Sequence, residues 1–377
     1  MKKNKLNKII RSCENLDVRK CRLLILSGNL QTTGGVETHL YEYCKFARDQ
    51  HIDVTLVIGS ITCNPDMKCL LESRGVKIIE FDFNSRRLGA INRLWCLIYF
   101  LLERYKYDFL YSHGISGYAL WVGRILAPKV WAHHHHNMAS AEVALEWPCG
   151  YINTLKTVDW IVCCTPNQAE FLNSSFSRSH QAICLPYLKC EPSLSAPRSQ
   201  IAKPKSITLG FFGRIQEAKG VRTLLELGPW LIENGFECRL HGEDKEFLLP
   251  KILPEAISWC GGYNAENELD SLMNAVDIVV IPSSGNEGLP IVLSEAISRG
   301  VPVVAFDGGG LKHIADFDRG IIVTPQSISN FKQAILTMRD RLAEPNLGTS
   351  LAKNYKENLG NLKTHQWWIN QFDHFDN

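Results

Sequence analysis

Two glutamates eight positions apart, Glu287 and Glu295, belong to a segment with the residue types of a ligand site. An apolar run at residues 278–282 precedes them and is typical of a buried strand. Residues 291–299 have the pattern of a helix, with Pro290 beside its first turn. We therefore expect Glu287 on a loop at the carboxyl end of a strand and Glu295 about one turn into the next helix. Open α/β sheets bind ligands at that end of their strands, and a helix N-terminus offers free N–H groups to phosphate.

Two carboxylates beside a turn that suits phosphate fit a ligand with hydroxyls on both sides of a diphosphate. A nucleotide sugar is such a ligand. The alternative is a pair of surface glutamates on an ordinary strand–loop–helix unit, and the pair alone does not decide between the two interpretations.

A second segment, residues 210–220, places two cations at another strand–helix corner. A strand is expected at residues 207–212 and a helix from about residue 221, with Arg214 and Lys219 between them. Arginine can bind a phosphate through a bidentate fork, and lysine can act as a point charge. A solvated basic loop is the alternative for such a pair.

Together these segments carry a specific resemblance. The order Gly213-Arg214-Ile215-x-x-x-Lys219-Gly220 followed by Glu287-x7-Glu295 resembles the retaining glycosyltransferases of family 4, which have the GT-B fold. Gly34-Gly35-Val36-Glu37 is similar to the glycine loop after the first strand of that family. The resemblance covers residues 20–375.

The resemblance implies roles for individual residues. Arg214 and Lys219 would hold the donor diphosphate, Glu295 would bind the ribose hydroxyls, and Glu287 would lie against the donor sugar. Gly35 would offer its backbone to the phosphate from the opposite domain. The implied donor-binding residues are Gly34, Gly35, Arg214, Lys219, Glu287, Gly288, Leu289 and Glu295, and the implied catalytic residues are His134, Glu287, Arg214 and Lys219.

Four consecutive histidines, residues 133–136, follow an apolar strand pattern at residues 130–132. Neighbouring side chains of an extended segment point to opposite faces, so four in a row cannot all bind one ion, and we predict no metal. A solvated loop is one alternative. The resemblance instead places a histidine in the cleft near the reacting sugar, as His134 or His136. His136 is also a candidate for the acceptor side. His113 ends another expected strand and is a further acceptor-side candidate, unless it is a structural histidine.

Strand and helix patterns alternate twice along the chain, which predicts an α/β protein with two doubly wound parallel sheets. Residues 1–188 form the expected N-terminal Rossmann-like domain on the acceptor side. Residues 189–205 have linker composition, with several prolines and serines. The expected donor domain covers residues 206–350. By the resemblance, residues 351–377 form a helix that packs back across the domain junction.

Composition excludes several classes of protein. A net charge of +2 gives no argument for nucleic acid, and 45% apolar with 21% charged residues is ordinary for a globular chain. The thirteen cysteines have no metal-binding spacing and are expected to be reduced and buried.

Residues 94–102 are too short an apolar run to span a bilayer. We expect a cytoplasmic protein, whose basic start at residues 2–11 is either a solubilising tail or a contact with anionic lipid at the membrane surface.

The predicted function is that of a retaining glycosyltransferase without cofactor or metal. Its donor would be a nucleotide sugar, and its acceptor a lipid-linked or surface-polysaccharide glycan intermediate, such as one of O-antigen, capsule or lipopolysaccharide. No acidic metal motif ends a strand, so side-chain cations and helix amides would stabilise the leaving diphosphate. The resemblance implies front-face attack. Two alternatives are a nucleotide-sugar epimerase of the same architecture and a catalytically silent binding subunit.

Overall fold

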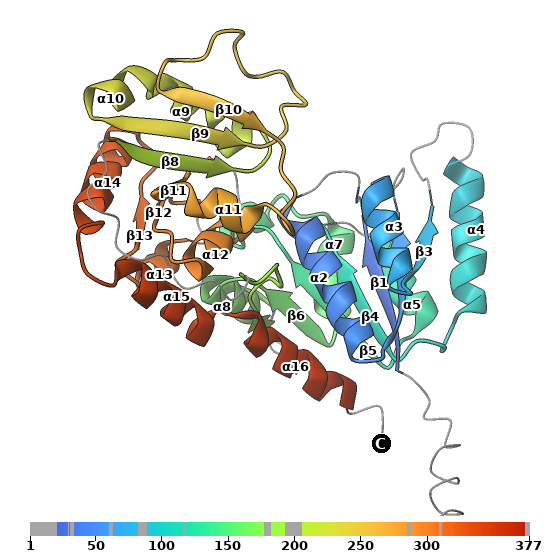
Figure 1. Cartoon of the computed structure of the whole chain (residues 1–377). Coiled ribbons are helices and arrows are strands. Elements are labelled where there is room, and N and C mark those ends of the chain that lie inside the picture. Colours follow the sequence, from blue (N-terminus) through green and yellow to red (C-terminus); the bar gives the residue numbers. More distant parts are fainter. Residues whose placement is uncertain are drawn as a thin grey trace, which may run out of the picture.

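The computed structural model describes residues 21–28, 30, 34–59, 63–81, 89–115, 118–176, 182–192, 206–284, 288–308 and 311–373. Apolar runs rich in Leu, Ile and Val form two parallel sheets, one in each domain (Figure 1). Among the described residues, no helix is both long enough and apolar enough to cross a bilayer.

The first sheet has seven strands in the order β3-β2-β1-β4-β5-β6-β7. Its strands are β1 Arg22–Ser27, β2 Asp53–Ile58, β3 Lys77–Glu80, β4 Phe109–His113, β5 Val130–His135, β6 Trp160–Cys163 and β7 Ala182–Cys184. The connecting helices are α2 Gly35–Asp49, α3 Pro65–Ser73, α4 Gly89–Leu102, α5 Tyr118–Leu126, α6 Ala141–Ala144, α7 Cys149–Thr157 and α8 Pro166–Ser175.

The second sheet has six strands in the order β10-β9-β8-β11-β12-β13. Its strands are β8 Ile207–Phe212, β9 Phe236–His241, β10 Ile257–Gly261, β11 Ile278–Ile281, β12 Val303–Phe306 and β13 Ile321–Thr324. The helical elements are η1 Glu217–Lys219, α9 Val221–Glu226, α10 Gly228–Glu233, α11 Leu269–Asn274, α12 Ile291–Ser298, α13 Lys312–Ala315, α14 Ile328–Arg341, α15 Leu347–Asn358 and α16 Asn361–Asp373.

Helices cover both faces of each sheet, because the strand side chains alternate between two apolar clusters. In β1, Leu23 and Ile25 pack with α2, whereas Leu24 and Leu26 pack with α4 and α5 on the other face. Trp368 of α16 lies in the first of these clusters. The last helix therefore runs from the second domain back onto the first (Figure 1). The prediction of two Rossmann-like domains, each with a doubly wound parallel sheet, is confirmed.

Each sheet reverses its strand order beside its first strand, between β1 and β4 and between β8 and β11. Ligands of such sheets bind at these switch points, at the carboxyl ends of the strands. The Gly34 loop, Arg214 and the loop before α12 each follow one of these four strands, and His113 is the last residue of β4.

Two details of the sequence interpretation are wrong. The solvated-loop alternative for the histidine run fails because β5 continues to His135, and His133, His134 and His135 are buried. The cysteines are free in the described part of the chain, but Cys69, Cys149 and Cys260 are exposed and not buried.

Candidate active site between the two domains

The loops after β8 and β11 lie side by side. The backbone N–H of Ser284 donates to the carbonyl oxygen of Ala218 at 3.1 Å. Gly220 has φ of +77° and packs against the carbonyl of Pro282, where a Cβ would collide with backbone. Glycine is therefore required at this corner, because it permits both the left-handed conformation and the close approach of the two loops.

The glycine loop of the first domain faces these two loops. A Cβ added to Gly34 would be 3.9 Å from Nη2 of Arg214, and one added to Gly35 would be 3.3 Å from Cγ2 of Ile291. Ile291 is the first residue of α12, and Gly35 is the first residue of α2. The structure thus brings the beginnings of two helices, one from each domain, and the Arg214 side chain together.

Glu37, in the first turn of α2, belongs to the same corner. A Cβ at Gly34 would be 2.7 Å from its Oε2. Burial raises the pKa of the Glu37 carboxyl, and the positive charges of Arg214 and Lys219 act in the opposite direction. We gave Glu37 no role from the sequence. The signal was its place two residues after the glycine pair, in the first turn of α2.

Gly288 and Leu289 join the two domains. A side chain at Gly288 would collide with the carbonyl oxygen of His136 and with Nε2 of Gln168. Leu289 is 3% exposed and lies in an apolar cluster with Cys164 and Tyr187 of the first domain. Glu287 lies outside the described residues.

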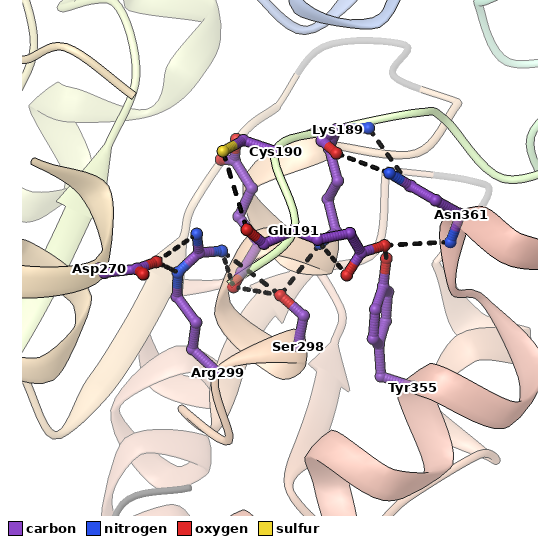
Figure 2. A network of polar contacts seen from close by, with 9 residues as sticks. Lys189, Cys190, Glu191, Asp270, Ser298, Arg299, Tyr355 and Asn361 are labelled. Carbon is purple, nitrogen blue, oxygen red and sulfur yellow. Dashed lines mark hydrogen bonds and ion pairs between the residues drawn. The ribbon is translucent and has the colours of Figure 1, made fainter. Parts of the chain in front are cut away.

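Glu295 is buried in α12, with 3% of its surface exposed. Burial raises the pKa of its carboxyl, and the charges of Lys189 and Arg299 act in the opposite direction. Arg299 donates from Nη1 to the carbonyl oxygen of Glu295 at 3.1 Å and from Nε to Asp270 at 2.6 Å. Glu295 is therefore held in a network of buried charges, part of which is seen in Figure 2.

Lys189 is the least expected member of this network, because it follows directly after the first domain in a segment with linker composition. Its side chain is fully buried, donates from Nζ to Oγ of Ser298 at 3.0 Å and lies 4.4 Å from the ring centre of Tyr355 (Figure 2). Burial lowers the pKa of Lys189 to about 8. Nothing in the local sequence pattern indicated that this lysine would be buried beside Glu295.

The histidine run provides two side chains to each face of the first sheet. His134 and His136 lie on the face that α2 covers, with their rings stacked at 4.2 Å, and His113 of β4 stacks on His136 at 5.1 Å. His39 of α2 completes the group, with its ring 4.9 Å from that of His134. His39 was missed from the sequence because only the fold brings α2 against β5.

Most ring nitrogens of these histidines have a hydrogen-bonding partner in another histidine or in a tyrosine hydroxyl. Nδ1 of His113 and Nε2 of His136 are 2.8 Å apart, and Nδ1 of His136 is 2.8 Å from the hydroxyl of Tyr187. Nδ1 of His134 is 2.6 Å from the hydroxyl of Tyr111. Nε2 of His113 is buried and has no hydrogen-bond partner.

Burial keeps this group of histidines neutral. It lowers the pKa of His39 to about 3 and holds those of His113, His134 and His136 well below the ordinary value, with the neighbouring rings adding to the effect on these three. His134 is 1% exposed, whereas His136 is partly exposed and its carbonyl faces the loop at Gly288. A neutral imidazole can donate or accept a hydrogen bond, but it does not add positive charge to the site.

His113, His134 and His136 could also hold a metal ion, since one nitrogen of each lies within 4.8 Å of the others. The third ring comes from β4, which pairs with β5, and the spacing of the four adjacent histidines does not indicate it. Both nitrogens of His134 and of His136 already face protein atoms: the second contacts are Cys164 Sγ at 3.3 Å and the His113 ring. A metal would have to displace these contacts.

Relatives with known names share parts of this chain. A D-inositol 3-phosphate glycosyltransferase of Corynebacterium jeikeium is 26% identical over 272 residues, which cover 62% of this chain and 64% of that protein. A putative colanic acid biosynthesis glycosyltransferase of Escherichia coli is 24% identical over 144 residues, 35% of this chain and 36% of that one. The chain thus matches less than two thirds of the length of these relatives.

Solved structures and family models give a consistent result. The crystal structure of Anabaena HepE in complex with UDP and glucose has the same fold, with a TM-score of 0.69 at 16% identity, over 94% of this chain and 100% of that one. The model described as "Glycosyltransferase Family 4" matches residues 33–183, and the model described as "Glycosyl transferases group 1" matches residues 206–341. Since the two matched segments together span most of the chain, the chain belongs to the group 1, family 4 type of glycosyltransferases.

Proposed function

We propose that this protein transfers a sugar from a nucleotide-sugar donor to a glycan acceptor, with retention of the anomeric configuration and without a metal ion. The observation that carries the proposal is the approach of the Gly34–Gly35 loop to Arg214 and to the first residue of α12. It creates a corner with two cationic side chains and two helix N-termini, which suits a diphosphate. HepE, which shares the fold, is a protein that binds UDP and glucose.

In the proposed reaction, the bond between the anomeric carbon and the diphosphate breaks with its electron pair moving to the phosphate oxygen. Arg214, Lys219 and backbone amides at the start of α12 stabilise this charge. The acceptor hydroxyl attacks from the same face, and its proton goes to the departing phosphate. Because bound cations and dipoles need no reorganisation during the reaction, they can lower the barrier substantially.

Glu37 is part of this proposal as the residue that moves or is neutralised when donor binds. Its carboxyl lies near the same two cations that would hold the diphosphate. A second anion at this corner would repel a carboxylate. We propose that Glu37 gives up this position to the donor diphosphate.

Glu287 is proposed to contact the transferred sugar and Glu295 the ribose. His136, the more exposed of the two stacked histidines, is proposed to contact the donor sugar as a neutral hydrogen-bonding group, with His134 behind it and His113 beside it. His113 would then extend the same group toward the acceptor.

The proposed acceptor is a lipid-linked or surface-polysaccharide intermediate, handled at the cytoplasmic face of the membrane. Support comes from the name of the relative in colanic acid biosynthesis. The basic residues 2–11, a candidate membrane contact, lie outside the described residues.

The test is to incubate purified protein with each common UDP-, GDP- and dTDP-sugar, with and without extracted lipid-linked glycans, and to identify products by mass spectrometry. We expect one donor to release its nucleoside diphosphate only when acceptor is present, together with a glycan heavier by one sugar. Conversion of a donor sugar to its epimer without acceptor would replace the proposal with the epimerase alternative. Binding of donors without turnover against the complete set of glycans would favour the silent subunit.

A further inference from the structure

Helix α4 has two apolar faces, of which only one packs on the protein. Cys96 and Phe100 are fully buried against the first sheet and α5. The opposite stripe recurs at intervals of three and four residues and stays exposed, with exposed fractions between 37% and 69% for Ile91, Leu94, Trp95, Ile98, Leu101 and Leu102. A helix of a globular protein normally has a polar face at these positions.

The exposure is concentrated in one place. Sixteen large apolar side chains are exposed in the described part of the chain, and seven of them lie between residues 91 and 105. Scattered exposed apolar residues are common, whereas a continuous stripe of them marks an interaction surface. In Figure 1, α4 lies at the outer edge of the first domain, on the side away from the second domain.

The charges and aromatic residues of the same segment indicate the kind of partner. Arg93, Arg104 and Lys106 are exposed. Glu103 is the single carboxylate of residues 89–106, and it pairs with Arg22 at 3.6 Å and with Lys106 at 3.0 Å. An apolar stripe with Trp95, bordered by cations and without an exposed carboxylate, is complementary to the acyl boundary and head groups of an anionic bilayer.

We propose that α4 docks the first domain on an anionic lipid surface, lying in the plane of the bilayer with its apolar stripe below the head groups. Its fourteen residues correspond to about 21 Å of helix, less than the roughly 30 Å of a bilayer core. The purpose that we assign to this surface, access to a lipid-linked acceptor, rests on the proposed function. The docking itself requires no transfer, so it can be tested separately.

The geometry leaves the candidate site clear. α4 packs on the face of the sheet opposite to α2, whereas the glycine loop, Arg214 and α12 gather at the carboxyl ends of the strands. A docked domain would therefore keep the cleft open to the second domain. The second domain would remain able to move over the bound donor.

The experiment is flotation of the full-length protein with vesicles of phosphatidylcholine alone or of phosphatidylcholine with phosphatidylglycerol. The test variant is Leu94→Glu/Ile98→Glu. The matched control is Ile232→Glu/Leu362→Glu, which changes two side chains of the second domain and α16 that are 51% and 75% exposed. A third variant, Arg93→Ala/Arg104→Ala, removes the charges and leaves the apolar stripe.

We expect wild type and control to float with the anionic vesicles, and the Leu94→Glu/Ile98→Glu variant to bind at least about tenfold more weakly. The arginine variant should lose binding to anionic vesicles and bind neutral ones as wild type does. Equal flotation of test variant and wild type would overturn the proposal, as would absence of wild-type binding to either vesicle. A wild-type dimer that the glutamates dissociate, without vesicle binding, would assign the stripe to a second copy of the chain instead. The proposed function is tested separately, by the transfer of sugar to a soluble acceptor. If the test variant transfers sugar to this acceptor but does not float, only the docking has been lost.

Discussion

Nζ of Lys189 donates a hydrogen bond to Oγ of Ser298 at 3.0 Å, and Ser298 in turn donates to the carbonyl oxygen of Glu295 at 2.9 Å. The segment that leaves the first domain is thus bonded to the helix that carries a predicted donor ligand. The same lysine exchanges backbone hydrogen bonds with the side chain of Asn361, at the start of α16 (Figure 2). Both chain crossings between the domains therefore meet beside Glu295.

This arrangement predicts strong coupling between Lys189 and Glu295. Lys189→Met leaves a buried carboxylate without one of its two cations, and we expect a loss of about 3 kcal/mol in the free energy of unfolding. Adding Glu295→Gln should recover at least about 1 kcal/mol, because the unpaired charge is removed. Urea unfolding of both single variants and the double variant measures this. Additive losses would show that the two groups do not interact.

The two glutamates should differ in nucleotide binding. Glu295→Gln is expected to weaken binding of the free nucleoside diphosphate and of the nucleotide sugar, since both contain ribose. Glu287→Gln should leave the affinity for the nucleoside diphosphate nearly unchanged. It should lower kcat by an amount equivalent to about 2–4 kcal/mol in the activation free energy, because its contact with the sugar strengthens in the transition state. Calorimetric titration of the product nucleotide decides. Equal loss of affinity in both variants would contradict the assigned roles.

The buried histidines predict a steep dependence of stability on pH. His39, His133 and His135 have pKa values lowered by burial to about 3, 3 and 4, below the ordinary 6.5, and burial lowers the pKa values of five more described histidines. A lowered pKa in the folded state means that the unfolded chain binds more protons below pH 6.5. This stability is therefore complete above about pH 6.5 and is lost as the pH falls toward the folded-state values.

Below pH 6.5, each histidine that stays neutral in the folded state should lower the free energy of unfolding by about 1.4 kcal/mol per pH unit. Denaturant unfolding measured at about pH 5 to about pH 7.5, on both sides of the ordinary histidine pKa, tests this dependence of stability on pH. His135→Phe should reduce the proton uptake on unfolding by about one. Stability that does not change with pH would mean that the histidines are protonated in the folded protein.

Chelation tests the absence of a metal from the proposed reaction. We expect transfer to proceed at the wild-type rate in excess EDTA, because Arg214 and Lys219 provide the positive charge at the diphosphate. Loss of activity that returns with Mg²⁺ would show that the diphosphate needs a cation from solution. Recovery with Zn²⁺ only, abolished in His113→Gln, would assign the metal to the histidine triad.

Much of the fold could be predicted because its strands are continuous apolar runs that end at glycine or polar residues. The expected strand at residues 207–212 is β8 itself, and the expected helix at residues 291–299 differs from α12 by one residue. The structure of the histidine run was harder to predict, since a polar run at a strand end resembles a loop. The run continues β5 because it pairs with β4 and β6, and the local sequence does not reveal this pairing.

The candidate site was predictable where one motif supplies both the turn and the chemistry, as at Gly34, Gly35 and Arg214. It was not predictable where partners come from distant segments. The backbone N–H of Leu188 donates to His39 across 149 residues, and the Lys189 side chain reaches Ser298 across 109. Such contacts depend on the packing of whole domains, and no local spacing encodes them.

The central claim is that a donor diphosphate binds between Arg214, Lys219 and the glycine loop. The most direct measurement is the initial rate of sugar transfer in Arg214→Ala compared with Arg222→Ala. Arg222 is an exposed arginine of the same corner, bonded to Glu217 at 2.8 Å, and serves as the matched control. We predict at least about a tenfold loss in kcat/KM for Arg214→Ala, from the removal of a charge-assisted contact, with the wild-type rate in Arg222→Ala. A folded Arg214→Ala variant that transfers sugar as fast as wild type would contradict the account.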